Sequence, residues 1–183
     1  MPIRYPIMAV LVTAVILFLV VVAYRAWKNR SNAQEAQFSA PLEWLEHPSG
    51  GRQWTNVQYV ATTLQGQPLE RVSAHGLGAR GFGKITVSLD GVLIERNGER
   101  AIGVPFAQLQ SVSKSTATID RTVEKDGLIQ LDWQQDGFGL STYLRATSGE
   151  TRKQLFEKLT EILSQTQVGS QAQPDTAEET PNE

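Results

Sequence analysis

The sequence predicts a single transmembrane α-helix near the N-terminus, followed by a mainly-β domain that ends in one amphipathic helix. Three observations support this fold class: an uninterrupted apolar run, short apolar runs separated by Asp-Gly and Asn-Gly pairs, and a helical apolar stripe near the C-terminus. The length of 183 residues suits one domain with attachments. We therefore divide the chain into an anchor with a basic flank (1–30), a linker (31–53), a β domain with its helix (54–164) and a disordered acidic tail (165–183).

The anchor is predicted from residues 7–24 (IMAVLVTAVILFLVVVAY), which carry no charge. As a helix this run would extend roughly 27 Å, close to the hydrocarbon thickness of a bilayer. A cleaved signal peptide is the alternative, but the run exceeds a typical signal core and no small-residue cleavage site follows it directly. Residues suited to the membrane interface follow instead: Tyr24, Arg25, Trp27, Lys28 and Arg30.

The cations around the apolar run predict its orientation. Arg25, Lys28 and Arg30 follow the run, whereas only Arg4 and the amino terminus precede it. Lys and Arg favour the cytoplasmic side of a membrane. The prediction is a single-pass plasma-membrane protein whose β domain lies in the cytoplasm, and the absence of cysteine is compatible with that location.

Strand signals recur throughout the middle of the chain. Four Asp-Gly or Asn-Gly pairs separate apolar runs, at residues 90–91, 97–98, 126–127 and 136–137. Both residues of such a pair accept a positive φ, which hairpin turns require. Strands at this spacing indicate an antiparallel sandwich or small barrel of about seven strands. The expected runs are residues 54–63, 69–72, 84–89, 92–96, 101–104, 117–124, 128–133 and 140–146.

One helix is predicted at residues 151–164 (TRKQLFEKLTEILS), where five apolar side chains share one stripe. Thr151 followed by Gln154 resembles a capping box at its start. The residues after 164 contain no basic side chain and no apolar periodicity, so they are expected to be disordered. The stripe consists of Leu155, Phe156, Leu159, Ile162 and Leu163.

The segment GLGARG matches the G-x-G-x-x-G pattern at Gly76, Gly78 and Gly81. A dinucleotide site needs a helix to begin within these glycines, but an alternating β-branched run follows them. We therefore expect a tight turn with glycines at positive φ and no cofactor. An anion site built from the glycine backbone and flanking cations is the alternative. The flanking residues are Arg71, His75, Arg80 and Lys84.

No pattern in the sequence indicates catalysis or a metal. Cysteine is absent, and His47 and His75 are far apart without clustered carboxylates. Neither a G-x-S-x-G elbow nor a Walker loop occurs. Acidic and basic residues balance between 54 and 163, which gives no long-range attraction for nucleic acid. We expect a protein that is not an enzyme.

The predicted layout, and several motifs within it, resemble a known family. The motifs are YVATT from Tyr59, PLERV from Pro68, AHGLGARG from Ala74, VPF from Val104 and IDRTVEKDGL from Ile119. They are similar to actinobacterial single-span membrane proteins with a bacterial PH-like domain, often labelled transporter, export or membrane proteins. Unlike PH domains that bind phosphoinositides, this chain has no charge in its first hairpin loop, LQGQP at 64–68.

These observations lead to two functional hypotheses. The first is a membrane-anchored, non-catalytic PH-like binding or scaffold module for a protein partner, such as an accessory component of a membrane or transport complex. The alternative is recognition of an anionic small ligand or lipid headgroup by the glycine-rich loop. The residues of that alternative site are Arg71, His75, Gly76, Gly78, Arg80, Gly81 and Lys84.

Overall fold

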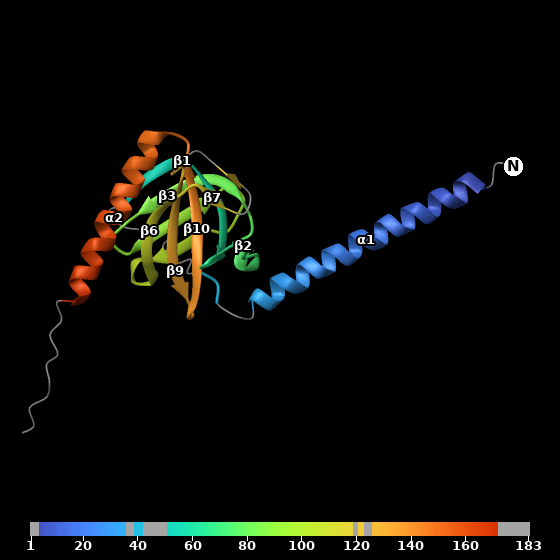
Figure 1. The fold of residues 1–183 in the computed structure, drawn as a ribbon, viewed down its shortest axis with the longest axis horizontal. Coiled ribbons are helices and arrows are strands. Elements are labelled where there is room, and N and C mark those ends of the chain that lie inside the picture. Colours follow the sequence, from blue (N-terminus) through green and yellow to red (C-terminus); the bar gives the residue numbers. More distant parts are fainter. Residues whose placement is uncertain (1–3, 36–38, 42–50, 119–120, 123–125, 172–183) are drawn as a thin grey trace, which may run out of the picture.

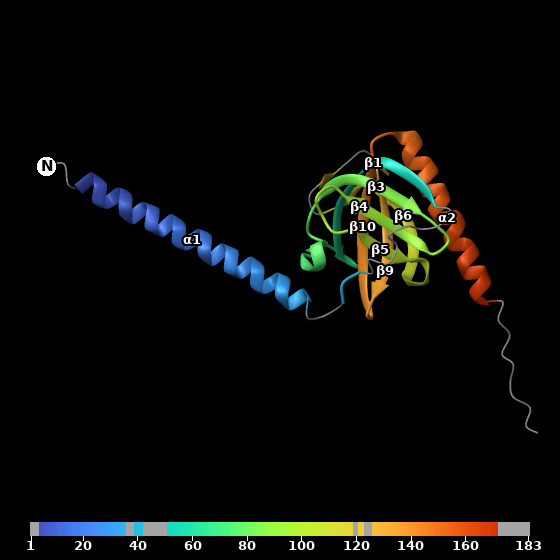
Figure 2. The same cartoon turned by 180° about the vertical axis from the view of Figure 1, so that it is seen from behind.

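The computed structural model describes residues 4–35, 39–41, 51–118, 121–122 and 126–171. Helix α1 (Arg4–Glu35) extends away from a curved β domain (Figure 1). Helix α2 (Gly149–Gln171) packs against that domain, and Figure 2 shows the same arrangement from behind. The predicted order of an apolar helix, an antiparallel sheet and a C-terminal helix is confirmed.

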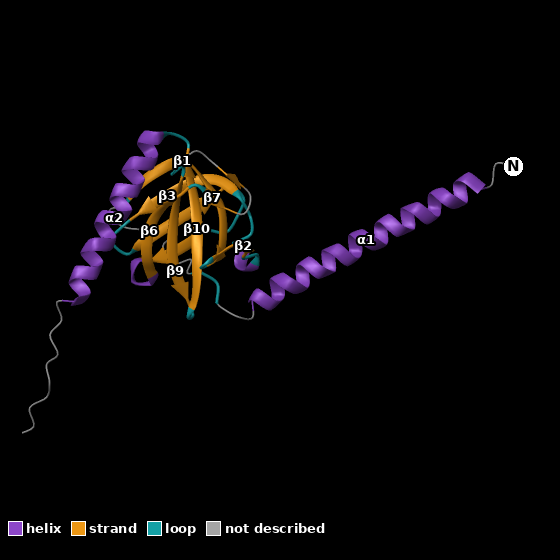
Figure 3. Cartoon of the chain, in the orientation of Figure 1, coloured by secondary structure: helices purple, strands orange, loops and turns teal. Residues whose placement is uncertain are grey.

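An eight-stranded antiparallel sheet forms most of the β domain, and strands dominate the chain between the two long helices (Figure 3). The strand order is β5-β4-β3-β1-β10-β9-β6, with β2 paired to β1 beside this path. The central strand β1 therefore joins the hairpins of β3, β4 and β5 to those of β10, β9 and β6. The bounds are β1 (Arg52–Leu64), β2 (Gln67–Arg71), β3 (Gly81–Val87), β4 (Gly91–Arg96), β5 (Ile102–Pro105), β6 (Leu109–Ser115), β9 (Leu128–Gln135) and β10 (Phe138–Ala146).

Strand β1 contains two irregularities that bend it. The register shifts between Thr55 and Val57 opposite β3, and between Tyr59 and Ala61 opposite β10. Asn56, the extra residue of the first shift, has a φ of 57°, a left-handed conformation that asparagine adopts more readily than most residues. Because bulges bend and twist a strand, β1 can pair with β3 along its first half and with β10 along its second half.

The main core lies between the inward face of the sheet and one side of α2. Trp133 and Tyr59 are its largest fully buried side chains, and α2 contributes Leu155, Leu159 and Ile162. Full burial of one such aliphatic side chain contributes roughly 1.5–3 kcal/mol. The apolar stripe predicted from the sequence is therefore what holds α2 on the sheet.

Helix α2 differs from the prediction at both ends. It begins at Gly149, and the N–H of Thr151 donates to Ser148 Oγ (3.1 Å), so Ser148 is the N-cap. Gln154 does not form a capping box but donates to Glu150 Oε1 (2.7 Å). The helix continues to residue 171, beyond the expected end at 164. Extending a packed helix needs no new nucleus, and glutamine is a good helix former. Residues 172–183 of the expected tail lie outside the described residues.

The strand predictions miss β6 and merge a short hairpin. Residues 109–115 are mostly serine and glutamine and gave no strand signal, but β9 provides a partner for them, and Ser111 Oγ donates to Asp132 Oδ2 (2.8 Å). The expected strand at 117–124 contains two short strands, β7 (Ala117–Thr118) and β8 (Arg121–Thr122).

Helix α1 also differs from the prediction, because it continues through Glu35 into the expected linker. Most of the rest of that linker, from 42 to 50, lies outside the described residues.

Candidate functional site

The glycine segment connects β2 to β3 and begins no long helix. Residues Ala74–Gly76 form a single 3₁₀ turn (η1), and β3 starts at Gly81, so the prediction that a strand follows the glycines is confirmed. Positive φ occurs at His75 (51°) and Gly76 (76°) but not at the other two motif glycines. At Gly78 the constraint is space, since a Cβ atom there would lie 3.1 Å from the Cα of Ser73.

The buried guanidinium of Arg96 holds this segment from the inside. Its Nη1 donates to the carbonyl oxygens of Gly76 and Ala79, and its Nη2 donates to that of Arg100, each at 2.7 Å. The guanidinium also lies 4.7 Å from the centroid of the Tyr59 ring. Burial lowers the pKa of Arg96. Two loop carbonyls thus face an internal cation, whereas an anion site would require the amide groups to converge.

A chain of buried hydroxyl groups joins the sheet to the same segment. Trp133 Nε1 donates to Thr142 Oγ1 (3.0 Å), and the oxygens of Thr142 and Thr62, and of Thr62 and Tyr59, are each 2.7 Å apart. Tyr59 Oη donates its single proton to the carbonyl of Leu77 (2.7 Å). Every donor in the chain must therefore point toward Leu77. Burial raises the pKa of Tyr59 to about 12, so this phenol stays protonated at neutral pH.

The cations of the predicted anion site are not gathered in one cluster. Arg71 pairs in register with Thr63 of β1, whereas Lys84 pairs with Thr55. Those two partners are separated by roughly 26 Å of extended strand. Lys84 is also engaged in an ion pair with Glu95 at 3.0 Å.

The remaining residues of that site lie between these two positions. His75 and Gly76 form η1 and are half-buried, Arg80 is exposed, and Gly81 begins β3. Binding of an anionic ligand by these residues stays a prediction.

Helix α1 contains one stretch, Met8–Ala26, that is long and apolar enough to cross a membrane by length and composition. None of this stretch is buried against the rest of the protein. Tyr24 and Arg25 lie at the C-terminal end of this stretch and Lys28 follows it on the same helix, and their place at a membrane interface stays a prediction. Trp27 and Arg30 belong to the same helix, but their side chains lie outside the described part of the chain.

The chain after α1 is attached to the β9–β10 turn. The N–H of Ser39 donates to Asp136 Oδ2 (2.6 Å), and Gln135 Nε2 donates to Ser39 Oγ (2.8 Å). Hydrogen bonding of Asp136 by the backbone N–H of Ser39, and by its side chain, lowers the pKa of Asp136. The end of α1 also lies beside η1 (Figure 1). The β9–β10 turn and η1 therefore mark the end of the β domain that faces the apolar helix.

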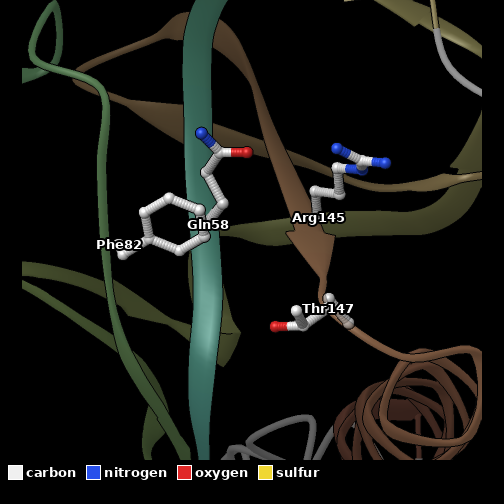
Figure 4. Close-up of a pocket in the computed structure, with 5 residues that line it drawn as sticks. Gln58, Phe82, Arg145 and Thr147 are labelled. Atoms are coloured by element: carbon white, nitrogen blue, oxygen red, sulfur yellow. The ribbon is translucent and has the colours of Figure 1, made fainter.

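A surface pocket of about 340 Å³ lies near the other end of β10 (Figure 4), and its lining includes Gln58, Phe82, Arg145 and Thr147. Gln58 on β1 pairs in register with Phe82 on β3 and with Arg145 on β10, so the three side chains form a row across three strands. In Figure 4 the Gln58 carboxamide lies between the Phe82 ring and the Arg145 guanidinium. Thr147 Oγ1 donates to the carbonyl of Asn56, which ties the end of β10 to the bulge in β1.

A second hollow, of about 500 Å³, shares Phe82 with the first. It is lined on its far side by the Lys84–Glu95 ion pair and by Asn97 and Gly98 of the next turn. Phe82, which is 55% exposed, therefore stands between two hollows.

Sequence reasoning missed Arg96, Gln58 and Arg145. The inward position of Arg96 could have been predicted from strand alternation. Arg96 follows Val92 and Ile94 at a spacing of two and therefore shares their inward face. No sequence pattern indicates that Gln58 and Arg145 are neighbours, because their juxtaposition depends on strand pairing. Within the described ranges, no group of three or more His, Asp or Glu residues is placed to hold a metal ion.

Comparison with known proteins places the domain in a family. The family described as Bacterial PH domain-like matches residues 42–160. The chain belongs to the bacterial PH domain-like family. The match covers the strands of this bacterial PH-like domain and about the first half of α2.

No curated protein matches the chain significantly. Among solved structures, a chain of "The 8S snRNP Assembly Intermediate" is similar over 78% of this chain and 97% of its own length, at 12% identity and a TM-score of 0.47.

Proposed function

We propose that this protein is a single-pass membrane protein whose bacterial PH-like domain is a non-catalytic binding module for a protein partner. The junction of α1 with the domain carries the proposal. Ser39 follows the end of α1 closely and is hydrogen-bonded to the β9–β10 turn. A domain joined this closely to an apolar helix would be confined to the bilayer surface. Confinement raises its effective concentration toward other membrane proteins, so a weak affinity is sufficient.

The β domain is proposed to lie in the cytoplasm, on the basis of the cations that follow the apolar run. One span cannot form a conduction path alone, so any role in transport would be that of an accessory component. The orientation can be tested because the chain has no cysteine. A single Ser170→Cys variant is treated with a membrane-impermeant maleimide in intact and permeabilised cells. Labelling only after permeabilisation is expected, and labelling of intact cells would reverse the orientation.

The partner-binding role is tested by capture from detergent-solubilised membranes. The full chain is compared with a variant truncated after residue 40, which keeps α1 and lacks the domain. Proteins captured by the full chain and not by the truncated chain are expected. If both capture the same proteins, the domain is not the binding module and the proposal fails.

A further inference from the structure

Two polar side chains of the Figure 4 pocket lack a partner within the described part of the chain. Gln58 is only 8% exposed, yet its carboxamide makes no hydrogen bond there. Arg145, half-buried in the same pocket, makes no side-chain hydrogen bond or ion pair with the described residues. The polar atoms of both side chains open into the pocket and are not among the fully buried unpaired atoms of the described residues. A ligand in the pocket can therefore reach them and complete their hydrogen bonds.

The three groups of the row have distinct and compatible chemistry. The Arg145 guanidinium presents a fixed fork of donors that fits a carboxylate. The Gln58 carboxamide offers both an acceptor and donors, which match the N–H and C=O of a peptide group. The exposed Phe82 ring offers a face for an apolar or aromatic side chain.

The spacing of the row is set by the sheet. Neighbouring strands lie about 5 Å apart, so the three groups span about 10 Å. That length corresponds to about three residues of an extended chain. A short peptide segment can therefore contact all three groups at once.

The position of the pocket is unfavourable for a lipid headgroup. Arg145 lies roughly 23 Å along β10 from Phe138, which adjoins the turn that binds Ser39. In addition, α1 continues for roughly 13 Å beyond Ala26 before the domain begins. A phosphate group is also a poorer fit, because it carries up to two negative charges and Arg145 is the single cation among the described residues lining this pocket.

We propose that the row of Gln58, Phe82 and Arg145 binds an acidic peptide segment of a partner protein. A carboxylate pairs with Arg145, a peptide group with Gln58, and an apolar or aromatic side chain with Phe82. This inference rests on the proposed function and deepens it by naming the surface and the chemistry of the partner.

The test uses the full chain in detergent micelles and a displayed library of random dodecapeptides. We expect selection to enrich Asp or Glu next to a large apolar residue. A fluorescent copy of a selected peptide should bind Arg145→Gln and Phe82→Ser at least about tenfold more weakly than the wild type. Gln58→Glu should also weaken binding, because it places a carboxylate beside Arg145. Lys153→Gln and Leu89→Ser, which change exposed residues outside the pocket, should bind as the wild type does.

Three outcomes would overturn the inference. Selected peptides without acidic residues would do so, as would equal binding of a selected peptide by the wild type, Arg145→Gln and Phe82→Ser. Loss of binding to phosphatidylserine vesicles in Arg145→Gln, with peptide binding unchanged, would assign the pocket to lipid. Thermal melts establish that each variant is folded, and Arg145→Gln removes no side-chain hydrogen bond or ion pair within the described residues.

The same variants separate this inference from the proposed function. If the wild type captures a partner from membranes and Arg145→Gln captures it equally, the site is wrong while the function stands. If the wild type captures nothing beyond the truncated chain, the proposed function fails whatever the peptides show.

Discussion

Replacement of Arg96 by alanine tests whether a buried cation fixes the glycine segment. The guanidinium makes three hydrogen bonds of 2.7 Å to backbone carbonyls and lies 4.7 Å from the Tyr59 ring centroid. A hydrogen bond to a charged group contributes roughly 1.5–3 kcal/mol, and a desolvated cation–π contact roughly 2 kcal/mol. Part of this sum is offset, because burial of the charge is itself costly and the freed carbonyls can regain water. We expect a net loss of roughly 3 kcal/mol, a large share of a typical domain's stability.

The loss is measured by urea unfolding of the full chain in micelles, followed by tryptophan fluorescence. Amide hydrogen exchange at residues 77–80 should accelerate in the same variant, because the segment loses its internal support. Arg80→Ala makes the same chemical change at an exposed position and should cost less than about 0.5 kcal/mol. Arg96→Lys keeps the positive charge but loses the planar set of guanidinium donors. Its loss of stability should therefore lie between those of Arg80→Ala and Arg96→Ala. An Arg96→Ala variant as stable as Arg80→Ala, with unchanged exchange, would refute the reasoning.

Three further predictions concern the hydroxyl chain, the glycines and the helix cap. An unfolded tyrosine ionises near pH 10, whereas Tyr59 has a pKa of about 12. Stability that is fully present below pH 10 should therefore fall by roughly 1.4 kcal/mol per unit as the pH rises toward 12. Urea melts should show this slope in the wild type and not in Tyr59→Phe; equal slopes would exclude Tyr59 as its source. Gly83→Ala should destabilise strongly, because its Cβ would lie 1.8 Å from the carbonyl oxygen of Glu95. Gly98→Ala has open space at a φ of 78° and should cost only about 1–2 kcal/mol, so the reverse order of melting temperatures would contradict the structure. Ser148→Ala should lose about 1 kcal/mol with fraying of the first turn of α2, and unchanged stability would show that Ser148 is not the cap.

The correctly predicted elements depend on short-range physics. A long apolar run of helix-compatible residues forms an apolar helix whatever follows it, and the stripe of α2 is fixed by spacing within one helix. Asp136-Gly137 shows the same locality, since both residues adopt the positive φ expected of them. Asn97-Gly98 shows that the dipeptide alone does not fix the conformation of both residues, because only Gly98 has a positive φ.

The sequence by itself determined the order and type of most elements and the failure of the dinucleotide pattern. Only the tertiary structure decided that β6 forms, because a polar edge strand needs a partner such as β9. Likewise, pairing between strands distant in sequence brings the Arg96 guanidinium to the glycine segment. The same kind of pairing aligns the row of Gln58, Phe82 and Arg145. A shift of one residue in either pairing would turn those side chains to the opposite face. Local sequence cannot encode that register, because the bulges of β1 and the packing of the whole sheet set it together.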